Sequence, residues 1–380
     1  MALSAYSITR YFARLRDPRR CHLRRHLLID IIAIAICAVI ANADDWQQVV
    51  TFAHHRRAWL QTFLTLPNGI PSHDTFERVF DRLDPQAFQV CFQRWVETLA
   101  RTLGLGHIAI DGKTLRHSGN GPKGWRPLHV VSAWASQVQL SFGQVVVDAK
   151  SNEITAIPRL LELLDLHGAL VTIDAMGCQK EIAKQIVDGG GDYLLSVKDN
   201  QPNLLADIQE CLTQALDSNF AGYEWDRYET VESGHGRQET RTYLILTNAE
   251  GIRNREAWAK LKVIGMCTTE RLLKDTGSDE VHYFIGSRVM SAQKYGEALR
   301  GHWGIENNLH WQLDITLGED ANRVQRRQGA ENLALVRRLV VGLLKRHPAK
   351  KSMACKRLAA SYSTDFLEEI LQHGCNLEKE

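Results

Sequence analysis

The sequence lacks the short cysteine spacings that mark a structural zinc site or a disulfide framework. It has no Cys-x-x-Cys pair and no histidines at zinc-finger spacing, and its eight cysteines are scattered over positions 21, 37, 91, 178, 211, 267, 355 and 375. We therefore expect neither a disulfide scaffold nor a structural zinc site.

A membrane-spanning run is also missing. The apolar stretch 27–43 is interrupted by Asp30 and is too short to cross a bilayer. The basic run 10–25 that precedes it is not followed by a small-residue cleavage site, so the beginning of the chain lacks a signal-peptide layout. These absences predict a cytoplasmic protein without membrane contact, in which 27–43 is a buried core helix.

Two further motifs of catalysis are absent. The glycine run 189–191 is not followed by the Lys-Ser/Thr of a phosphate-binding loop, so no nucleotide cofactor is expected. There is also no convincing Ser/His/Asp arrangement, which argues against a covalent enzyme intermediate.

The charges present are unevenly distributed. The whole chain has 46 basic and 44 acidic side chains, a net charge of +2, but residues 322–357 carry 11 basic side chains against one acidic. Residues 1–106 carry 13 against 9, with no lysine, whereas residues 107–321 carry 21 against 29. One interpretation is a carboxylate site that needs a metal, flanked by cationic segments that hold a polyanion; the other is ordinary solvated faces.

Hydrophobic periodicity divides the 380 residues into regions of different type. Helices are expected over 27–43, 46–64, 75–83, 85 to near 101, 153–166, 179–187, 203–216, from near 291 past 306, and over 332–346 as the last one. Strands are expected over 107–114, 128–135, 142–147, 170–175, 193–197, 223–231, 237–246, 263–268 and 282–287. The pattern predicts an all-α domain over 1–106 and an α/β domain over 107–346. The latter has a mixed sheet covered by helices and a β-rich insertion at about 203–290. A tail, 347–380, follows.

Two aspartates occupy equivalent positions in this scheme. Asp111 follows the apolar residues 108–110, and Asp174 follows the apolar run 171–173. A carboxylate at the end of a buried strand is costly unless it is paired or bound to a cation. Each aspartate alone is better explained as a turn cap, but together they suggest a site for hard cations, Mg²⁺ or Mn²⁺.

A third ligand is needed, and Glu306 is the preferred candidate. With His302 and His310 it forms a four-residue spacing on one face of the expected helix. Asp314, Glu319 and Asp320 are rivals on sequence chemistry alone. Three carboxylates can hold two metal ions on either side of a phosphodiester that undergoes in-line attack.

Several long stretches then match a known family. They are PNGIPSHDTFERVF, AIDGKTLR, KSNEITAIPRLLELLDL, VTIDAMGCQKEIAKQIVDGGGDYLLSVKDNQP and HWGIENNLHWQLDITLGED, spread between about residues 20 and 345. The chain thereby resembles the H repeat-associated transposases, an insertion-sequence family of the DDE superfamily. The resemblance implies a ribonuclease H-like α/β catalytic core, a β-rich insertion before the last catalytic helix, and an associated N-terminal helical DNA-binding domain. Carried over residue by residue, the catalytic and metal-binding triad is Asp111, Asp174 and Glu306.

Two positions depart from the pattern. Related transposases place Arg four residues before the catalytic Glu and Lys seven after it, where this sequence has His302 and Leu313. Contacts to DNA are expected at Lys113, Lys198, Arg300, His302, Trp303, Arg323, Arg326, Arg327, Arg19, Arg20 and Arg24. The alternative is that these residues are ordinary surface charges or pack in the core.

The function predicted in this way is a DNA transposase with two Mg²⁺ or Mn²⁺ ions. It would bind double-stranded DNA with terminal inverted repeats, as a homodimer on paired ends, and associate with the nucleoid of a bacterium. Two alternatives stay open: a domesticated DNA-binding protein that no longer transposes, and a structure-selective nuclease on the same fold.

Overall fold

The structure is a computed structural model that describes residues 10–100, 106–119, 126–147, 152–234, 237–247, 250–273, 276–324 and 326–375. The chain forms two compact units. We call residues 1–104, 112–150 and 306–380 the helical unit, and residues 105–111 and 151–305 the strand unit. No helix within the described ranges combines the length and apolarity that crossing a membrane requires.

The helical unit is built around two largely buried helices that contact one another. Helix α2 (Leu28–Ile40) is buried at 12 of its 13 positions, which explains why its sequence is apolar apart from Asp30, whose carboxylate accepts a hydrogen bond from the Leu66 amide at 2.9 Å. Helix α11 (Arg327–Arg346) packs on α2 and on strand β3. Around them lie α3 (Trp46–His55), α4 (Arg57–Leu60), α5 (His73–Phe80) and α6 (Pro85–Ala100). The predicted end of the last of these, near 101, lies outside the described residues.

Strand β1 (His107–Leu115) runs through both units. In the helical unit the strand order is β3-β2-β1, with β2 (Leu128–Ala135) and β3 (Leu140–Val146) forming an antiparallel hairpin. In the strand unit the order is β1-β4-β5-β9-β8-β7-β6, in which β1, β4 and β5 are parallel and the others antiparallel. The sheet is therefore mixed, as expected.

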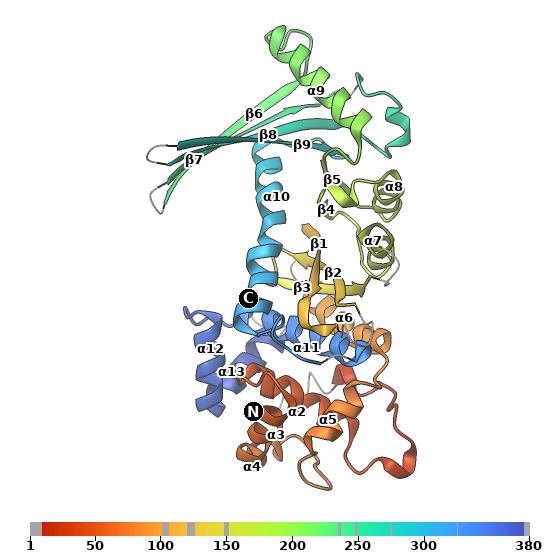
Figure 1. Ribbon diagram of the computed structural model, residues 1–380, viewed down its shortest axis with the longest axis vertical. Coiled ribbons are helices and arrows are strands. Elements are labelled where there is room, and N and C mark those ends of the chain that lie inside the picture. The colour runs from red at the N-terminus through yellow and green to blue at the C-terminus, as the bar shows by residue number, and fades with distance from the viewer. Residues whose placement is uncertain are drawn as a thin grey trace. The chain divides into compact units, whose positions relative to one another are not determined.

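The strand unit alternates strands and helices before the four long strands. In chain order it contains α7 (Glu153–Leu161), β4 (Leu170–Ile173), α8 (Lys180–Asp188), β5 (Asp192–Val197), α9 (Pro202–Asp217), β6 (Trp225–Gly234), β7 (Arg237–Leu246), β8 (Val263–Leu273), β9 (Thr276–Gly286) and α10 (Ala292–Ile305). Figure 1 shows β6–β9 as one curved layer, with α9 on one face and α10 meeting the other. The β-rich segment expected before the last catalytic helix is thus present.

One expectation about the C-terminal third is confirmed in part, and another is wrong. The helix that carries Glu306 does not continue as an α-helix: α10 ends at Ile305 and π-helical segments follow, η6 (Glu306–His310) and η7 (Gln312–Thr316). Helix α11 is also not the last one, because α12 (Met353–Tyr362) and α13 (Thr364–Cys375) follow. Helix α11 ends at Arg346, just before His347 and Pro348, and the Ser352 hydroxyl then caps a new helix by accepting from the Cys355 amide. The domain boundaries proposed along the chain stay predictions.

Candidate active site

The two predicted aspartates lie next to one another on neighbouring strands of the sheet. Strands β1 and β4 are parallel, and their last register pair is Ile110 with Ile173, so Asp111 and Asp174 follow the same rung of the ladder. Both carboxylates are half-buried. The turn after β4 fixes Asp174, whose Oδ1 accepts a hydrogen bond from the Gly177 amide at 3.3 Å. Parallel pairing therefore places the two carboxylates side by side, Asp174 directly after β4 and Asp111 within β1, which continues to Leu115.

A third carboxylate joins them, and it is one that the sequence did not suggest. Glu153, at the first turn of α7, offers an oxygen within 4.8 Å of oxygens of Asp111 and Asp174, and all three residues are half-buried. Its place within the matching stretch KSNEITAIPRLLELLDL was the available signal, but a first-turn glutamate is usually just a favourable charge at a helix N-terminus. We call Asp111, Glu153 and Asp174 the carboxylate cluster.

The electrostatics of the cluster favour a cation. Burial, and next the charge of Glu153, raise the pKa of Asp174 above its usual value, against the amides of Gly177 and Met176 and the positive charge of Lys198. Carboxylates that approach one another this closely cannot all stay ionised without a neutralising partner. Oxygen donors in this number suit Mg²⁺ or Mn²⁺, so the residues present fit a divalent metal.

Glu306 lies outside this cluster. It is the first residue of the helical unit after the strand unit, it opens segment η6, and its side chain is exposed. The neighbouring apolar stripe is confirmed, because Ile305, Leu309 and Leu313 are fully buried. The helical face predicted for His302, Glu306 and His310 stays a prediction: in the structure Glu306 is exposed, whereas the two histidines are half-buried.

His302 takes part in a hydrogen-bonded chain across three elements of the strand unit. Its Nδ1 lies 3.1 Å from Oγ1 of Thr172 on β4, and the same oxygen lies 2.9 Å from Nε2 of His107 on β1. Burial lowers the pKa of both histidines to about 4, so both are neutral at physiological pH. A neutral, hydrogen-bonded His302 fits a role in positioning β4 better than a clamp on phosphate, and its DNA contact stays a prediction.

Lys113 is buried in an ion cluster of the helical unit. Its Nζ lies 2.7 Å from Asp314, 3.2 Å from Glu319 and 3.2 Å from Asp320. Burial alone would lower the pKa of Lys113, but the three carboxylates outweigh burial and raise the pKa above its usual value. These three carboxylates, which were the alternatives to Glu306 in the sequence, thus form ion pairs with a lysine. Lys198, in contrast, is exposed, although its charge acts on Asp174.

Arg300 and Trp303 contact the long strands of the strand unit. Arg300 pairs with Glu232 of β6 at 2.9 Å. The guanidinium of Arg241, on β7, lies 5.9 Å from the ring centroid of Trp303. The expected DNA contacts of both residues stay predictions, and both side chains already have protein partners.

The predicted N-terminal arginines differ in their surroundings. Arg19 binds the Asp17 carboxylate at 2.7 Å and the His26 carbonyl at 2.7 Å, which gives it a structural role in this turn. Arg24 donates to the Arg19 carbonyl at 2.9 Å, whereas Arg20 is exposed. Arg20 and Arg24 are both exposed, whereas Arg19 is half-buried in the turn.

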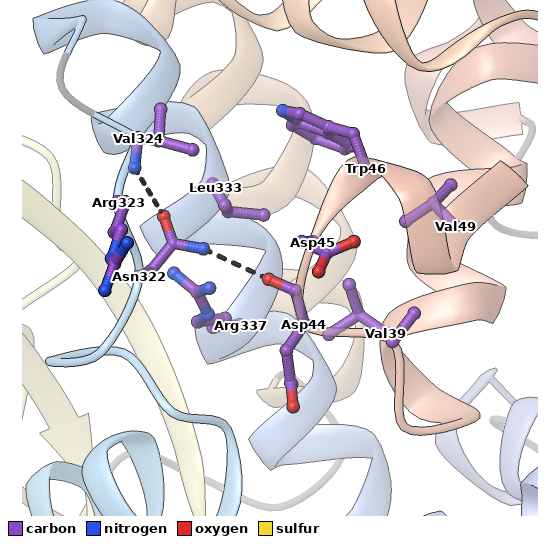
Figure 2. Close-up of a pocket in the computed structure, with 11 residues that line it drawn as sticks. Val39, Asp44, Asp45, Trp46, Val49, Asn322, Arg323, Val324, Leu333 and Arg337 are labelled. Carbon is purple, nitrogen blue, oxygen red and sulfur yellow. Dashed lines mark hydrogen bonds between the residues drawn. The ribbon is translucent and has the colours of Figure 1, made fainter.

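The three arginines near the start of α11 also differ from one another. Arg326 pairs at 3.1 Å with the buried carboxylate of Asp81, while Arg323 and Arg327 are exposed. Arg323 borders a small, mainly apolar pocket of about 120 Å³ between the α2–α3 connection and α11. Figure 2 shows Trp46 and Leu333 among its walls, and Asn322 bridging to the Asp44 carbonyl at 3.1 Å. The pocket is distinct from the carboxylate cluster.

Comparison with known proteins identifies the family. Residues 9–96 match the family described as DDE_Tnp_1-associated, and residues 102–343 match the Transposase DDE domain. The "Putative transposase YncI" of Escherichia coli O157:H7 is 39% identical over 374 residues, which cover 97% of this chain and 95% of that protein. The "H repeat-associated putative transposase YhhI" of Escherichia coli K12 is 36% identical over 361 residues, 93% of this chain and 95% of that one.

Among solved structures, a piggyBac transposase synaptic complex with hairpin DNA aligns over 97% of this chain and 78% of that chain. Its identity is 11% and its TM-score 0.41, too low to support an argument. The sequence matches identify the family, because they span the helical N-terminal region and the mixed α/β core that carries the carboxylate cluster. This chain belongs to the DDE transposase family, where its relatives include H repeat-associated members.

Proposed function

We propose that this chain is the transposase of an insertion sequence: it cleaves DNA at the ends of its element and joins the freed 3′-hydroxyls to target DNA. The observation that carries the proposal is the meeting of Asp111 and Asp174 on adjacent parallel strands, with Glu153 beside them. Membership of the DDE family supports the reaction type, and no observation favours the domesticated binding protein or the branch-selective nuclease. The mixed sheet is consistent with a ribonuclease H-like core.

In the proposed site, Asp111 and Asp174 would hold a divalent metal, with Glu153 as an additional oxygen donor. Glu306 is proposed as the third catalytic carboxylate on the family resemblance alone. Mg²⁺ or Mn²⁺ held by these residues would supply the Lewis acidity that lowers the pKa of an attacking hydroxyl and stabilises the leaving oxygen. The Gly177 amide keeps the Asp174 carboxylate in one orientation. Lys198, exposed and within electrostatic range of Asp174, is placed to bind a phosphate of the scissile strand.

The partner proposed for this site is double-stranded DNA with terminal inverted repeats. Cleavage of two ends in one event requires two active sites, so we propose a homodimer on the paired ends. The charge distribution matches this partner, because the cluster lies in the acidic middle of the sequence and the cationic segments flank it.

The test is cleavage of a duplex that carries the element's end, with Mg²⁺ or Mn²⁺, by the parent protein and by Asp111→Asn and Asp174→Asn. These substitutions keep the size of the side chain and remove its charge. We expect nicking at the element terminus to fall by at least about 10³-fold, since several kcal/mol of transition-state stabilisation depend on the metal.

Glu162→Gln is the matched control, because Glu162 is an exposed carboxylate that follows α7. Glu153→Gln should raise the metal concentration needed for half-maximal cleavage, whereas the control should not. Undiminished cleavage by Asp111→Asn and Asp174→Asn would refute the proposed site.

A further inference from the structure

An arginine-lined cavity of about 610 Å³ opens on the helical unit, lined by the chain around residues 19–26 and by α5. The described residues of its wall are four arginines, one histidine, two hydroxyl side chains and two aliphatic side chains, and none of them is a carboxylate. The arginines are Arg19, Arg25, Arg78 and Arg82. A concave site with this composition is suited to a polyanion rather than to a neutral or cationic ligand.

The geometry of α5 concentrates these groups on one face. The lining positions 72, 75, 78, 79 and 82 follow one another at the three- and four-residue steps that share a helical face. Ser72 precedes the helix and its hydroxyl lies 3.1 Å from that of Thr75. The same face therefore offers two hydroxyls near the start of the helix and two guanidiniums further along it, with Val79 between them.

The opposite wall is held by hydrogen bonds within the protein. Arg19 bridges the Asp17 carboxylate and the His26 carbonyl. The Arg25 carbonyl accepts from the Asn68 side chain, in the turn that leads to α5. The Arg19 hydrogen bonds hold one wall in shape, and the Asn68–Arg25 hydrogen bond ties it to the segment that leads to α5. Because the cavity is formed before any ligand arrives, less conformational entropy is lost on binding.

Three of the four arginines form no ion pair with a carboxylate of the described ranges. Arg19 is paired with Asp17, but Arg25, Arg78 and Arg82 are exposed and make no such pair. Two nearby carboxylates have other partners: Asp74 pairs with His73 at 3.1 Å, and Asp81 with Arg326. The cavity thus keeps positive charge that a ligand can use.

We propose that this cavity binds the sugar–phosphate backbone of the DNA on which the transposase acts. This inference rests on the function proposed above. Arginine forks match phosphate oxygens, and the Ser72 and Thr75 hydroxyls add neutral donors. The described lining includes no tryptophan, tyrosine or phenylalanine that could stack on a base. The site contributes affinity that does not depend on DNA sequence, while recognition of the element's end lies elsewhere.

The inference is tested by equilibrium DNA binding without divalent metal, so that cleavage plays no part. The test variant combines Arg25→Gln, Arg78→Gln and Arg82→Gln; Arg57→Gln, Lys350→Gln and Lys351→Gln, three cations outside the cavity lining, form the matched control. Removing one arginine–phosphate interaction should reduce the slope of log affinity against log salt by about 0.9, so the test variant should show a slope smaller by about 2.7. We expect at least tenfold weaker binding, equal for end-bearing and scrambled duplexes.

Each outcome is decisive. Equal effects of the two triple variants, or weakening confined to the end-bearing duplex, would overturn the cavity as a backbone site while leaving the transposase function intact. Inorganic phosphate that competes with DNA at millimolar concentration would identify a free-phosphate site instead. Absence of DNA binding by the parent protein would overturn both proposals. If the triple variant unfolds, Arg82→Gln alone replaces it, with an expected slope reduction of about 0.9.

Discussion

At the scale of single residues, some residues of the site could be predicted from a local sequence pattern, whereas others are recognised only in the folded structure. Asp111 and Asp174 could be predicted because each ends an apolar strand run, and a carboxylate there is anomalous. Glu153 could not, because its approach to Asp111 depends on the packing of segments that are distant along the chain. The carboxylates around Lys113 could not either, since Asp314 and Glu319 belong to a segment far beyond the strand that carries the lysine.

The Lys113 ion cluster leads to a prediction about stability. Lys113→Met should lower the free energy of unfolding by about 3–5 kcal/mol, because it leaves the buried carboxylate of Glu319 and its neighbours without their shared cation. Lys198→Met, at an exposed lysine, should change it by no more than about 0.5 kcal/mol but should weaken DNA binding. Urea unfolding measures the first effect. A Lys113→Met protein as stable as its parent, with weakened DNA binding, would restore Lys113 as a phosphate contact.

At the scale of elements, hydrophobic periodicity predicted the strands and most helices. Periodicity failed to predict those features whose conformation depends on tertiary contacts. An α-helical spacing of Ile305, Leu309 and Leu313 was correct for burial but not for the π-helical turn that carries Glu306. Single wide turns of this kind often occur at functional sites, which is consistent with the proposed role of Glu306. The chain His107–Thr172–His302 similarly joins β1, β4 and α10 through hydrogen bonds that no local pattern encodes.

This hydrogen-bonded chain predicts how stability changes with pH. The pKa of His107 is lowered to about 4, firstly by burial, and the unfolded chain protonates near 6.5. Unfolding therefore takes up a proton between these values, so stability is fully present above pH 6.5 and falls as the pH decreases towards 4. The substitution His107→Gln removes the titration of this imidazole. The variant should therefore lose about 3 kcal/mol less stability than the parent between pH 6.5 and 4.

Denaturant unfolding at several pH values gives the comparison. His54→Gln is the control, since His54 is exposed and its substitution should leave the profile unchanged. Identical pH profiles for the parent and His107→Gln would show that the buried histidine does not couple to folding.

At the scale of the whole molecule, the net charge of +2 conceals groups with different uses. The cationic segment 322–357 does not act as one surface: Arg338 is fully buried against Glu319 at 3.0 Å, and Arg357 is 1% exposed, while Arg323 and Arg327 are exposed. A count along the sequence therefore overstates the charge available to DNA. The arginines of the α5 cavity were not in the predicted set, apart from Arg19, because their grouping depends on the turn that brings residues 19–26 to α5.

Arg357 shows why the segment after α11 belongs to the fold. Its guanidinium donates to the Val39 carbonyl at 3.1 Å and the Ala43 carbonyl at 3.4 Å, binds Asp44 at 2.8 Å, and also donates to the Thr316 carbonyl. One side chain of α12 thereby satisfies the end of α2 and of η7. The sequence interpretation as a tail missed this because buried arginines look the same as exposed ones in a charge count.

Truncation after Arg346 should consequently unfold the helical unit, rather than shorten the chain and leave the rest of the unit folded. Removing α12 and α13 takes away the packing of α11 on α13 and leaves the carbonyls that Arg357 binds without their donor, and each unsatisfied buried group costs about 1–3 kcal/mol. Amide hydrogen exchange should show loss of protection in α2, the centre of that unit. The variant Tyr362→Ala, at a residue that ends α12 and is 79% exposed, should keep the protection of α2. If the truncated protein protects α2 as the parent does, the C-terminal helices are dispensable and the segment is a tail after all.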